Sequence, residues 1–429
     1  MTRTRPLALV LLLLAACSAP ADDSNGDMLP VVEVAPDAPL GAVLEGPPAA
    51  PSHLQTTLAS IVEPATVVLR PGRYNLQAEA FTDSTCGNCQ ELETPVPGTR
   101  GLHVTVPGVR IVGPGADSAF IHTNAGYGLY FDGCDGCALE GVTVTGGVRD
   151  PDGRAADGGV VVKNGRVELT DCVVRDNIGD SATVAETVVG IAGVVGREGS
   201  EIVVDGCRVI RNSWDGFALY RQASAEITNT VVDGVDAARG GQVGGGRGVG
   251  IGATWDASVM VRNTLVRNYW KGIGGFVDAR VDARCNIVEE ILTWGLAFWG
   301  ADGGAPAAVF RENVVYETGA CGAMIARETE VAEGEDPGEL VGNVFVATGQ
   351  DPRYDSGTPY CHQRAIARHA VPPGFEIERN LVHDAREPGD EWPTSEPVDR
   401  EAVRSLGWIQ ELARMPVFSG SSFLTELGR

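Results

Sequence analysis

The chain has 429 residues, of which 33 are Lys or Arg and 57 are Asp or Glu, and its formal net charge is −24. A surface of this sign repels phosphate backbones, so we expect no nucleic acid among its partners. Gly is abundant at 56 residues and aromatic residues make up only 6%, which favours a fold with thin layers and many tight turns.

The N-terminus reads as an export signal. Arg3 and Arg5 precede an apolar stretch over residues 7–14 that is too short to span a bilayer. The Leu-Ala-Ala-Cys sequence ending at Cys17 resembles the lipobox of bacterial lipoproteins, and this resemblance implies acylation of Cys17. An ordinary secretory signal with an incidental Cys is the alternative.

This interpretation sets the expected cellular location. Residues 1–17 form the signal peptide ending at Cys17, and residues 18–50, rich in Pro, Ala and acidic residues, form a flexible tether. We therefore expect a protein anchored by lipid at the bacterial outer membrane or cell surface, touching the membrane only through its N-terminal lipid.

The folded part is expected to begin with a short helix and a broken strand. Residues 53–62 place Leu54, Leu58, Ile61 and Val62 on one helical face. The sequence ATVVLRPGRYNL follows, an apolar strand that Pro71-Gly72 interrupts and Tyr74 resumes.

One short pattern then returns about nine times between residues 137 and 384. Each copy has alternating apolar residues, a small or amide-bearing residue, and a second apolar run, as in VMVRNTLVRN from Val259. The small or amide-bearing positions, which we call the anchors, are Val142, Cys172, Cys207, Thr230, Thr264, Asn286, Asn313, Asn343 and Asn380. Successive anchors are 22 to 37 residues apart, and a repeat of this length without helical periodicity predicts a solenoid of strands.

The helix, the strand–Pro-Gly–Tyr turn and the repeats together resemble right-handed parallel β-helix proteins of the pectin-lyase-like superfamily. The resemblance covers roughly residues 53–384 and implies an all-β solenoid over residues 51–397, with the short helix capping its first coil. These elements are specific to the fold and are common to many activities.

Each repeat also predicts its own geometry. Val259 and Val261 point inward, while Met260 and Arg262 point outward. The pair Asn263-Thr264 then turns the chain, because Asn tolerates the left-handed conformation, and stacked Asn or Thr side chains can bond from coil to coil.

Residues 398–429 are predicted to be a C-terminal helical cap. Val403, Leu406, Ile409 and Leu412 form one apolar stripe, and Asp399 is a suitable N-cap. An open coil exposes unpaired backbone groups, so we expect this segment to cover the last coil.

Eight cysteines are disulfide candidates in an exported protein. Cys172 and Cys207 occupy the same repeat position, and Cys321 and Cys361 precede matching strands one coil apart.

The remaining four candidates form two short motifs, Cys86-Gly-Asn-Cys89 and Cys134-Asp-Gly-Cys137. Together they could supply four thiolates to a zinc ion, or form two disulfides that cross-link the first coils. The oxidising compartment favours disulfides, and we expect no resident metal at these cysteines.

Three tryptophans precede glycine-led strands at nearly the same place in the repeat. Trp214, Trp270 and Trp294 lie seven, six and eight residues after their anchors. A row of indole rings can stack on sugar rings. The alternative is that the rings pack under neighbouring turns, because Trp is mostly buried.

Charged residues around the same strands suggest two kinds of polysaccharide cleavage. A lyase needs a base and a cation beside a carboxylate, for which Lys271 and Arg327 are candidates. A hydrolase needs two carboxylates across the cleaved bond, for which Asp215 and Asp278 are the best pair. Asp256 and Asp278 are candidate calcium ligands.

A ladder of outward Arg residues is also predicted. Arg262, Arg284 and Arg311 fall at equivalent positions of consecutive coils. They could meet an acidic glycan, or form a solvated, salt-linked face with Glu289, Glu290 and Glu312. The signatures typical of polygalacturonases and pectate lyases are absent from the sequence.

The leading hypothesis is a monomeric, surface-anchored β-helix lipoprotein that binds polysaccharide along one outer face and cleaves it if it is an enzyme. The alternative is a non-catalytic structural or adhesion protein of the cell envelope, whose partner is another envelope component. A third hypothesis is an accessory protein for metal-site assembly.

Overall fold

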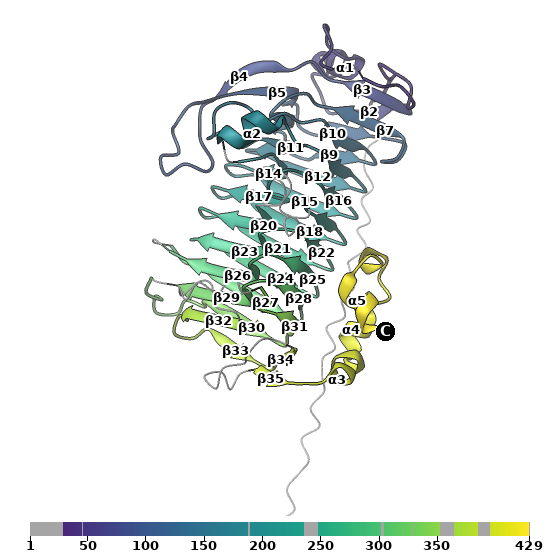
Figure 1. Cartoon of the computed structure of the whole chain (residues 1–429). Coiled ribbons are helices and arrows are strands. Elements are labelled where there is room, and N and C mark those ends of the chain that lie inside the picture. The colour runs from purple at the N-terminus through teal and green to yellow at the C-terminus, as the bar shows by residue number, and fades with distance from the viewer. Residues whose placement is uncertain are drawn as a thin grey trace, which may run out of the picture.

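The chain winds into stacked coils, and most coils contribute one strand to each of three sheets (Figure 1). The computed structural model describes residues 29–428 except 45, 188, 236–247, 302–303, 328, 352–363 and 385–394. Cys17 and Cys361 lie outside the described residues, so the acylation prediction and the Cys321–Cys361 disulfide stay predictions.

The three sheets, here called A, B and C, follow the chain in a regular order. Sheet A contains β1 Val31–Val34, β2 Thr66–Leu69, β6 Arg110–Val112, β9 Cys137–Glu140, β12 Arg166–Thr170, β15 Glu201–Asp205, β18 Ser224–Thr228, β21 Ser258–Arg262, β24 Arg280–Arg284, β27 Ala307–Arg311, β30 Gly338–Val341 and β33 Glu376–Glu378. Sheet B contains β3 Gly72–Asn75, β7 Ala119–His122, β10 Thr143–Thr145, β13 Val173–Arg175, β16 Arg208–Ile210, β19 Val231–Asp233, β22 Leu265–Arg267, β25 Ile287–Ile291, β28 Val314–Thr318, β31 Val344–Thr348, β34 Asn380–His383 and β35 Ser395–Pro397. Sheet C contains β4 Glu79–Asp83, β5 Val96–Val104, β8 Tyr127–Asp132, β11 Gly158–Lys163, β14 Ala192–Gly196, β17 Phe217–Tyr220, β20 Val249–Thr254, β23 Lys271–Val277, β26 Trp294–Gly300, β29 Cys321–Arg327 and β32 Arg364–Ala370.

Pairing between neighbouring coils is parallel, with one antiparallel exception between β4 and β5 among the described strands. The alternation predicted for the coils is confirmed: Val259 and Val261 are buried, Arg262 is exposed, and Met260 is intermediate. Inward side chains of all three sheets form one apolar core along the axis. The expected all-β parallel β-helix is therefore the observed fold.

The corner between sheets A and B explains the repeat in the sequence. In all nine anchored coils the residue before the anchor has a positive φ, between 50° and 68°. These residues are Gly141, Asp171, Gly206, Asn229, Asn263, Cys285, Glu312, Gly342 and Arg379. The left-handed residue turns the chain sharply, and the anchor that follows is buried in every coil.

Stacked anchors bond from coil to coil, as predicted. The amide oxygen of Asn313 accepts both the backbone N–H and the side-chain Nδ2–H of Asn286, at 3.1 and 3.0 Å. Asn313 donates in turn to Asn343 at 3.0 Å, and Asn343 donates to Asn380 at 3.0 Å. This ladder satisfies buried polar groups that a closed corner would otherwise leave unpaired.

The first coil is closed by a helix and an added strand. Helix α1, His53–Ser60, is the short helix expected here and buries Leu54 and Leu58 against the axial core, while its role as an N-terminal cap stays a prediction. Residues 31–34 form β1, which pairs with β2 and covers the edge of sheet A. The predicted tether over residues 18–50 is therefore wrong for its C-terminal part, because backbone hydrogen bonds tie β1 to the solenoid.

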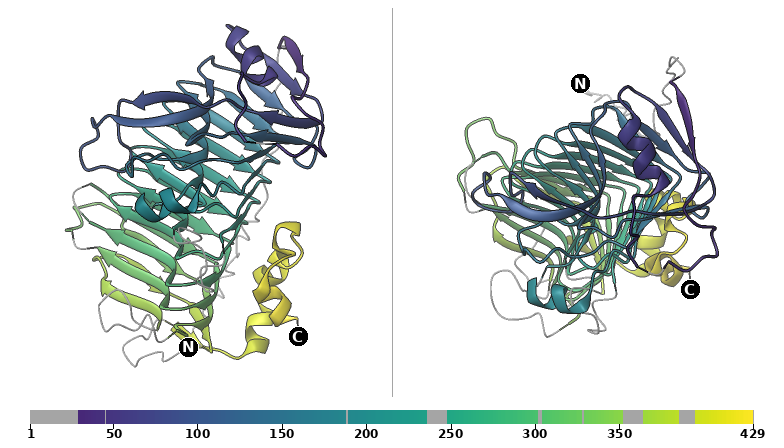
Figure 2. Two further views of the ribbon diagram at one scale, coloured as in Figure 1. Left: turned by 45° about the horizontal axis from the view of Figure 1, so that its top comes forward. Right: turned by 90° about the horizontal axis from the view of Figure 1, so that it is seen from above.

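The C-terminal segment does not cover the last coil. Helices α3 Arg400–Ser405, α4 Gly407–Leu412 and α5 Ser422–Leu427, with the 3-10 turn η2 Pro416–Phe418, lie beside the stack along sheet B (Figures 1 and 2). Their buried residues, including Ile409 and Phe423, pack on outward residues of sheet B such as Ile287 and Val314. The predicted apolar stripe is real, but its position as a terminal lid is wrong.

A buried carboxylate fixes the end of this segment. Glu289 on β25 is fully buried and accepts hydrogen bonds from the Ser421 hydroxyl and from the backbone N–H groups of Ser422 and Phe423, at 2.8 to 3.1 Å. One further helix, α2 Ser181–Thr187, lies between β13 and β14. Within the described part of the chain, no helix has both the length and the apolarity needed to cross a membrane.

The ladder gives a first prediction. Asn313→Ala removes the buried acceptor of the Asn286 backbone N–H and side-chain Nδ2–H, and also the donor to the Ala283 carbonyl, so we expect the melting temperature to fall by the equivalent of about 3 kcal/mol. Calorimetry of the purified protein measures this change. Asn88→Ala, at an exposed position, is the control and should cost less than about 0.5 kcal/mol. Equal melting temperatures for the two variants would contradict the structural role of the ladder.

Candidate functional site on sheet C

Sheet C offers the widest outer face, because its strands reach seven residues, as in β23 and β26. A column of glycines runs along its edge nearest sheet B, including Gly216, Gly250 and Gly272. A Cβ at Gly272 would lie 2.2 Å from the Gly295 carbonyl and 2.5 Å from Val288. Glycine therefore lets this corner close tightly and holds the beginnings of the strands in register.

Three charged or aromatic residues form one column across sheet C, and each of them directly precedes a glycine in the sequence. Lys271 pairs with Val249 on one side and with Trp294 on the other. Asp215 lies opposite Val249, because Phe217 pairs with Ile251 two residues further on. The backbone N–H of Val249 donates to Asp215 Oδ1 at 2.6 Å. The structure thus places Asp215, Lys271 and Trp294 at one level across four coils.

Asp215 and Lys271 are mutually dependent ionisable groups. Burial raises the pKa of Asp215 to about 7, against the opposing effects of the Val249 N–H and the charge of Lys271. Burial lowers the pKa of Lys271, and Asp215 opposes that shift. A carboxyl group whose pKa lies near neutrality, two coils from a lysine of lowered pKa, is found both in proton-transfer sites and in structural charge networks.

Aromatic rings surround the ammonium of Lys271. Its Nζ lies 5.0 Å from the ring centroid of Trp294 and 5.2 Å from that of Phe276. Trp294 meets Trp299 edge to face, at 6.2 Å between centroids. Gly274 lies between Lys271 and Phe276, and a Cβ there would lie 2.7 Å from the Phe276 ring. The bare glycine lets this ring lie back over the strand toward Lys271.

The predicted row of three tryptophans is wrong for one member. The backbone N–H of Trp270 donates to the Gly248 carbonyl, and Gly248 lies opposite Trp214 on the preceding coil. Trp214 and Trp270 therefore occupy one column, two coils apart. Thr293, not Trp294, continues this column, because its N–H bonds the Trp270 carbonyl. Trp294 is 6% exposed and packs in the neighbouring column, whereas Trp270 is 37% exposed.

The hydrolase pair predicted from the sequence is not formed. Asp278 follows the C-terminal end of β23, whereas Asp215 lies level with its first residue, Lys271. At about 3.3 Å per residue the two levels are roughly 20 Å apart. A glycosidic pair needs carboxyl groups about 5 to 9.5 Å apart. Asp215 and Asp278 therefore cannot act on one bond.

Arg327 is also too far from Lys271 to serve the predicted lyase site. It pairs with Gly300, which pairs with Val277 at the far end of β23. Its guanidinium is buried, pairs with Glu335, and also donates to the carbonyls of Pro306 and Glu330. This residue holds an adjoining loop, and its donors are engaged there.

The calcium candidates do lie together. The Asp256 backbone N–H donates to Asp278 Oδ1 at 2.7 Å, and a hydrogen bond with Asp278 raises the pKa of the Asp256 carboxyl. Among the described residues, no group of three or more His, Cys, Asp and Glu side chains is placed to hold a metal. Calcium binding at this pair stays a prediction.

The arginine ladder exists, but on another face. Arg262, Arg284 and Arg311 pair in register on sheet A. Arg284 pairs with Asp282 at 2.7 Å, and Arg311 pairs with Glu339. The ladder is ion-paired, but through Asp282 and Glu339 rather than the predicted Glu289, Glu290 and Glu312, and it lies on a different sheet from the tryptophans.

Both CxxC motifs form disulfides, as favoured over zinc, but each closes within its own motif. The predicted disulfide cross-links between coils are therefore wrong. The two cysteines of each motif bond to each other, because their Cα atoms lie 5.3 and 5.8 Å apart, within the range of a disulfide. Cys172 and Cys207 stack on adjacent coils as predicted, yet they remain buried thiols. Their Sγ atoms bond backbone carbonyls, Leu139 and Thr170 for Cys172 and Leu169 and Asp205 for Cys207.

Sheet C carries a second charged cluster that was not predicted from the sequence. Lys163 and Arg197 stand at equivalent positions on β11 and just beyond β14, since Val162 pairs with Gly196. Both are buried, and both contact Asp83 at the end of β4. The signal was present in the shared VVVKNG and VVGREG sequences, where a cation follows a valine-rich strand.

Comparison with known proteins supports the fold. Residues 116–276 match the family model described as the right handed beta helix region. A search of curated protein sequences gives no match. Among solved structures, pectate lyase Pel9A aligns with 82% of this chain and 80% of its own, at 13% identity and a TM-score of 0.48.

Two further structures are similarly distant. The A-module of Azotobacter vinelandii mannuronan C-5 epimerase AlgE4 aligns with 84% of this chain and 93% of its own, at 13% identity and a TM-score of 0.44. The Dettilon tailspike protein gp208 aligns with 82% of this chain and 62% of its own, at 14% identity and a TM-score of 0.49. These similarities are too distant to transfer an activity.

The raised pKa of Asp215 predicts a pH effect on stability. The folded state holds the proton up to about pH 7, whereas an unfolded Asp releases it near pH 3.9. The stabilising contribution is therefore present below about pH 4 and is lost as the pH rises through 7. Asp215→Asn cannot titrate, so the wild type should lose melting temperature relative to this variant between pH 4 and 8.

Differential scanning fluorimetry across this pH range measures the difference. Asp135→Asn, at an exposed position, is the control and should follow the wild type at every pH. A constant offset between the wild type and Asp215→Asn from pH 4 to 8 would show that Asp215 is ionised in the folded protein throughout.

Proposed function

We propose that the outer face of sheet C from β17 to β26 binds a polysaccharide chain that runs along the axis of the solenoid. The observation that carries this proposal is the shared column of Trp214 and Trp270. The two tryptophans lie two coils apart, and this separation of about 10 Å is close to the length of two linked pyranose rings. The coil between them carries Gly248 at this level, so no side chain intervenes.

The setting of these rings suits sugar binding more than protein packing. Trp270 is 37% exposed although large apolar residues are usually buried, and Trp214 is half-buried. Lys271 directly follows Trp270 and Asp215 directly follows Trp214. An aromatic platform with the partly exposed Lys271 beside it matches both the apolar face and the hydroxyl rim of a sugar.

The same pair of residues supports a cleavage chemistry. A lysine of lowered pKa can accept the proton beside a sugar carboxylate, which begins an elimination. Lys271 and Asp215 lie at one level of sheet C, two coils apart, and each affects the pKa of the other. A non-catalytic envelope or adhesion protein remains the alternative, and it would retain binding without product release.

Export to the cell surface is part of the proposal. The two disulfides support it, because such bonds persist in oxidising compartments and are rare in the cytosol. Acylation at Cys17 would then attach the solenoid to the membrane by its N-terminus.

Binding is tested with the two tryptophans. We expect Trp214→Ala and Trp270→Ala each to weaken binding about tenfold, which corresponds to about 1.4 kcal/mol of lost stacking. Affinity electrophoresis against a panel of neutral and acidic glycans measures retention. Trp408→Ala, on helix α4 beside sheet B, is the matched control. Unchanged retention in both sheet C variants would reject the proposed surface.

Cleavage is tested separately at Lys271. Lys271→Met keeps the apolar stem over Trp294 and removes the amine, so we expect it to abolish release of unsaturated or reducing ends while glycan retention persists. Product release is measured by ultraviolet absorbance and a reducing-end assay on the same panel. Product release at the wild-type rate by Lys271→Met would exclude this residue as the base.

A further inference from the structure

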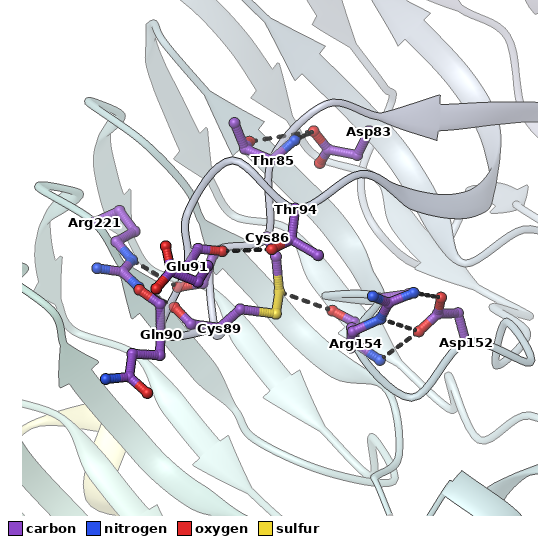
Figure 3. Close-up of a disulfide and its surroundings, with 12 residues drawn as sticks. Asp83, Thr85, Cys86, Cys89, Gln90, Glu91, Thr94, Asp152, Arg154 and Arg221 are labelled. Atoms are coloured by element: carbon purple, nitrogen blue, oxygen red, sulfur yellow. Dashed lines mark hydrogen bonds and ion pairs between the residues drawn. A yellow bond between two sulfur atoms is a disulfide. The ribbon is translucent and has the colours of Figure 1, made fainter.

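The loop between β4 and β5 carries one of the two disulfides of the described chain. This loop, residues 84–95, joins two antiparallel strands (Figures 1 and 3). Its disulfide joins Cys86 to Cys89, and the other disulfide joins Cys134 to Cys137 with the same spacing. The two bonds close rings of equal size, so a difference in their reactivity must come from their surroundings.

The two disulfides differ in exposure. Cys134 and Cys137 are fully buried in the axial core, and both Sγ atoms contact the Val106 carbonyl, at 3.2 and 3.4 Å. In the loop, Cys86 is also buried, but Cys89 is partly exposed. A thiolate can attack a disulfide only where it reaches one of the sulfur atoms. Among these four cysteines Cys89 alone is not buried, so its Sγ is the atom open to attack.

A guanidinium lies at the tip of this loop. Arg221, just beyond β17, donates to the carbonyls of the loop residues Gly87, Cys89 and Gln90. Its guanidinium also stacks over the Trp255 ring at 4.3 Å, and no carboxylate in the described part of the chain forms an ion pair with it. An uncompensated positive charge favours thiolates and the anionic transition state of thiol–disulfide exchange. The accessible sulfur and this charge therefore coincide at Cys89.

The loop has hydrogen bonds that hold its shape without this disulfide. The Cys86 N–H donates to the Leu92 carbonyl at 2.8 Å. The N–H and the hydroxyl of Thr94 donate to the carbonyls of Leu92 and Glu91, at 2.8 and 2.7 Å. A disulfide stabilises a protein less when the loop that it closes is short. We therefore expect the bond to open and close while the loop stays folded, which a reversible exchange requires.

We infer that Cys86 and Cys89 form a thiol–disulfide exchange site whose reaction partner is a dithiol of another exported protein. A thiolate of the partner attacks Cys89 Sγ and bonds to it, the Cys86–Cys89 bond breaks, and its electron pair passes to Cys86 Sγ, which takes up a proton. The second thiol of the partner then displaces Cys89 as a thiol, and the partner leaves as a disulfide. Two electrons and two protons pass to this chain, and the reverse reaction returns them. This activity goes beyond the proposed function and does not depend on sugar binding.

The first test compares the two disulfides within the folded protein. Dithiothreitol is the probe, iodoacetamide traps the thiols that it releases, and mass spectrometry of the peptides identifies them. We expect the Cys86–Cys89 bond to be reduced about tenfold faster than the Cys134–Cys137 bond, because only the former has an accessible sulfur. Equal rates for the two bonds would overturn the inference, and so would reduction of the Cys86–Cys89 bond only in denaturant.

The attacked sulfur is tested with single-cysteine variants. Cys86→Ser leaves Cys89 as a free thiol, and Cys89→Ser leaves Cys86. Glutathione disulfide is the probe, and mass spectrometry measures the mixed disulfide that each variant forms. We expect Cys89 to be modified about tenfold faster than Cys86, because it is exposed and lies beside Arg221. Modification of Cys86 at the same or a higher rate would overturn the inference.

The charge at the tip is tested with Arg221→Met, and Arg154→Met is the matched control. The Arg154 carbonyl contacts Cys86 Sγ at 3.8 Å, but its guanidinium pairs with Asp152 at 2.6 Å (Figure 3). We expect Arg221→Met to slow reduction by dithiothreitol about threefold and Arg221→Lys to restore most of the rate, because the charge returns. Arg154→Met should react as the wild type does. A rate in Arg221→Met that equals or exceeds the wild-type rate would overturn this role of Arg221.

Discussion

The corner between sheets A and B sets the geometry of the whole molecule. One residue in the left-handed conformation turns each coil, and the buried anchor after it bonds to the anchor of the next coil. Because the amide of Asn313 accepts two donors from Asn286, a coil that slipped by one residue would leave both unpaired. The ladder therefore fixes the register, and the register creates the columns on which the candidate site stands.

The repeat and its corner were predictable because both are local. Alternation gave the strands, and the Asn and Thr anchors gave the turn, even where Glu312 or Arg379 adopts the left-handed conformation. The prediction of a tryptophan row was wrong for Trp294 for a related reason. Thr293 lies seven residues after its anchor and Trp270 six, so coils of unequal length share one column. Counting from the anchor missed by one residue, and in a strand one residue changes the direction of the side chain.

Contacts between distant segments were beyond the reach of that reasoning. Asp83 meets Lys163 and Arg197 across 80 and 114 residues, through an insertion that the repeat does not describe. The C-terminal helices were correctly predicted as amphipathic, but their partner was not identified. A signal for it existed, because outward residues of sheet B such as Ile287, Val314 and Val344 are apolar and require a cover.

The three faces now have different roles. Sheet A presents ion-paired charges such as Arg284 with Asp282, which suit a solvated surface. Sheet B is covered by the C-terminal helices through Glu289 and its three donors. Sheet C binds Asp83 of β4 through Lys163 on its N-terminal coils and carries Trp270, with its exposed ring, on a later coil. Trp214 and Trp270 stand at one level of sheet C and Lys271 follows Trp270 directly, so a ligand that follows the axis at this level would meet all three residues.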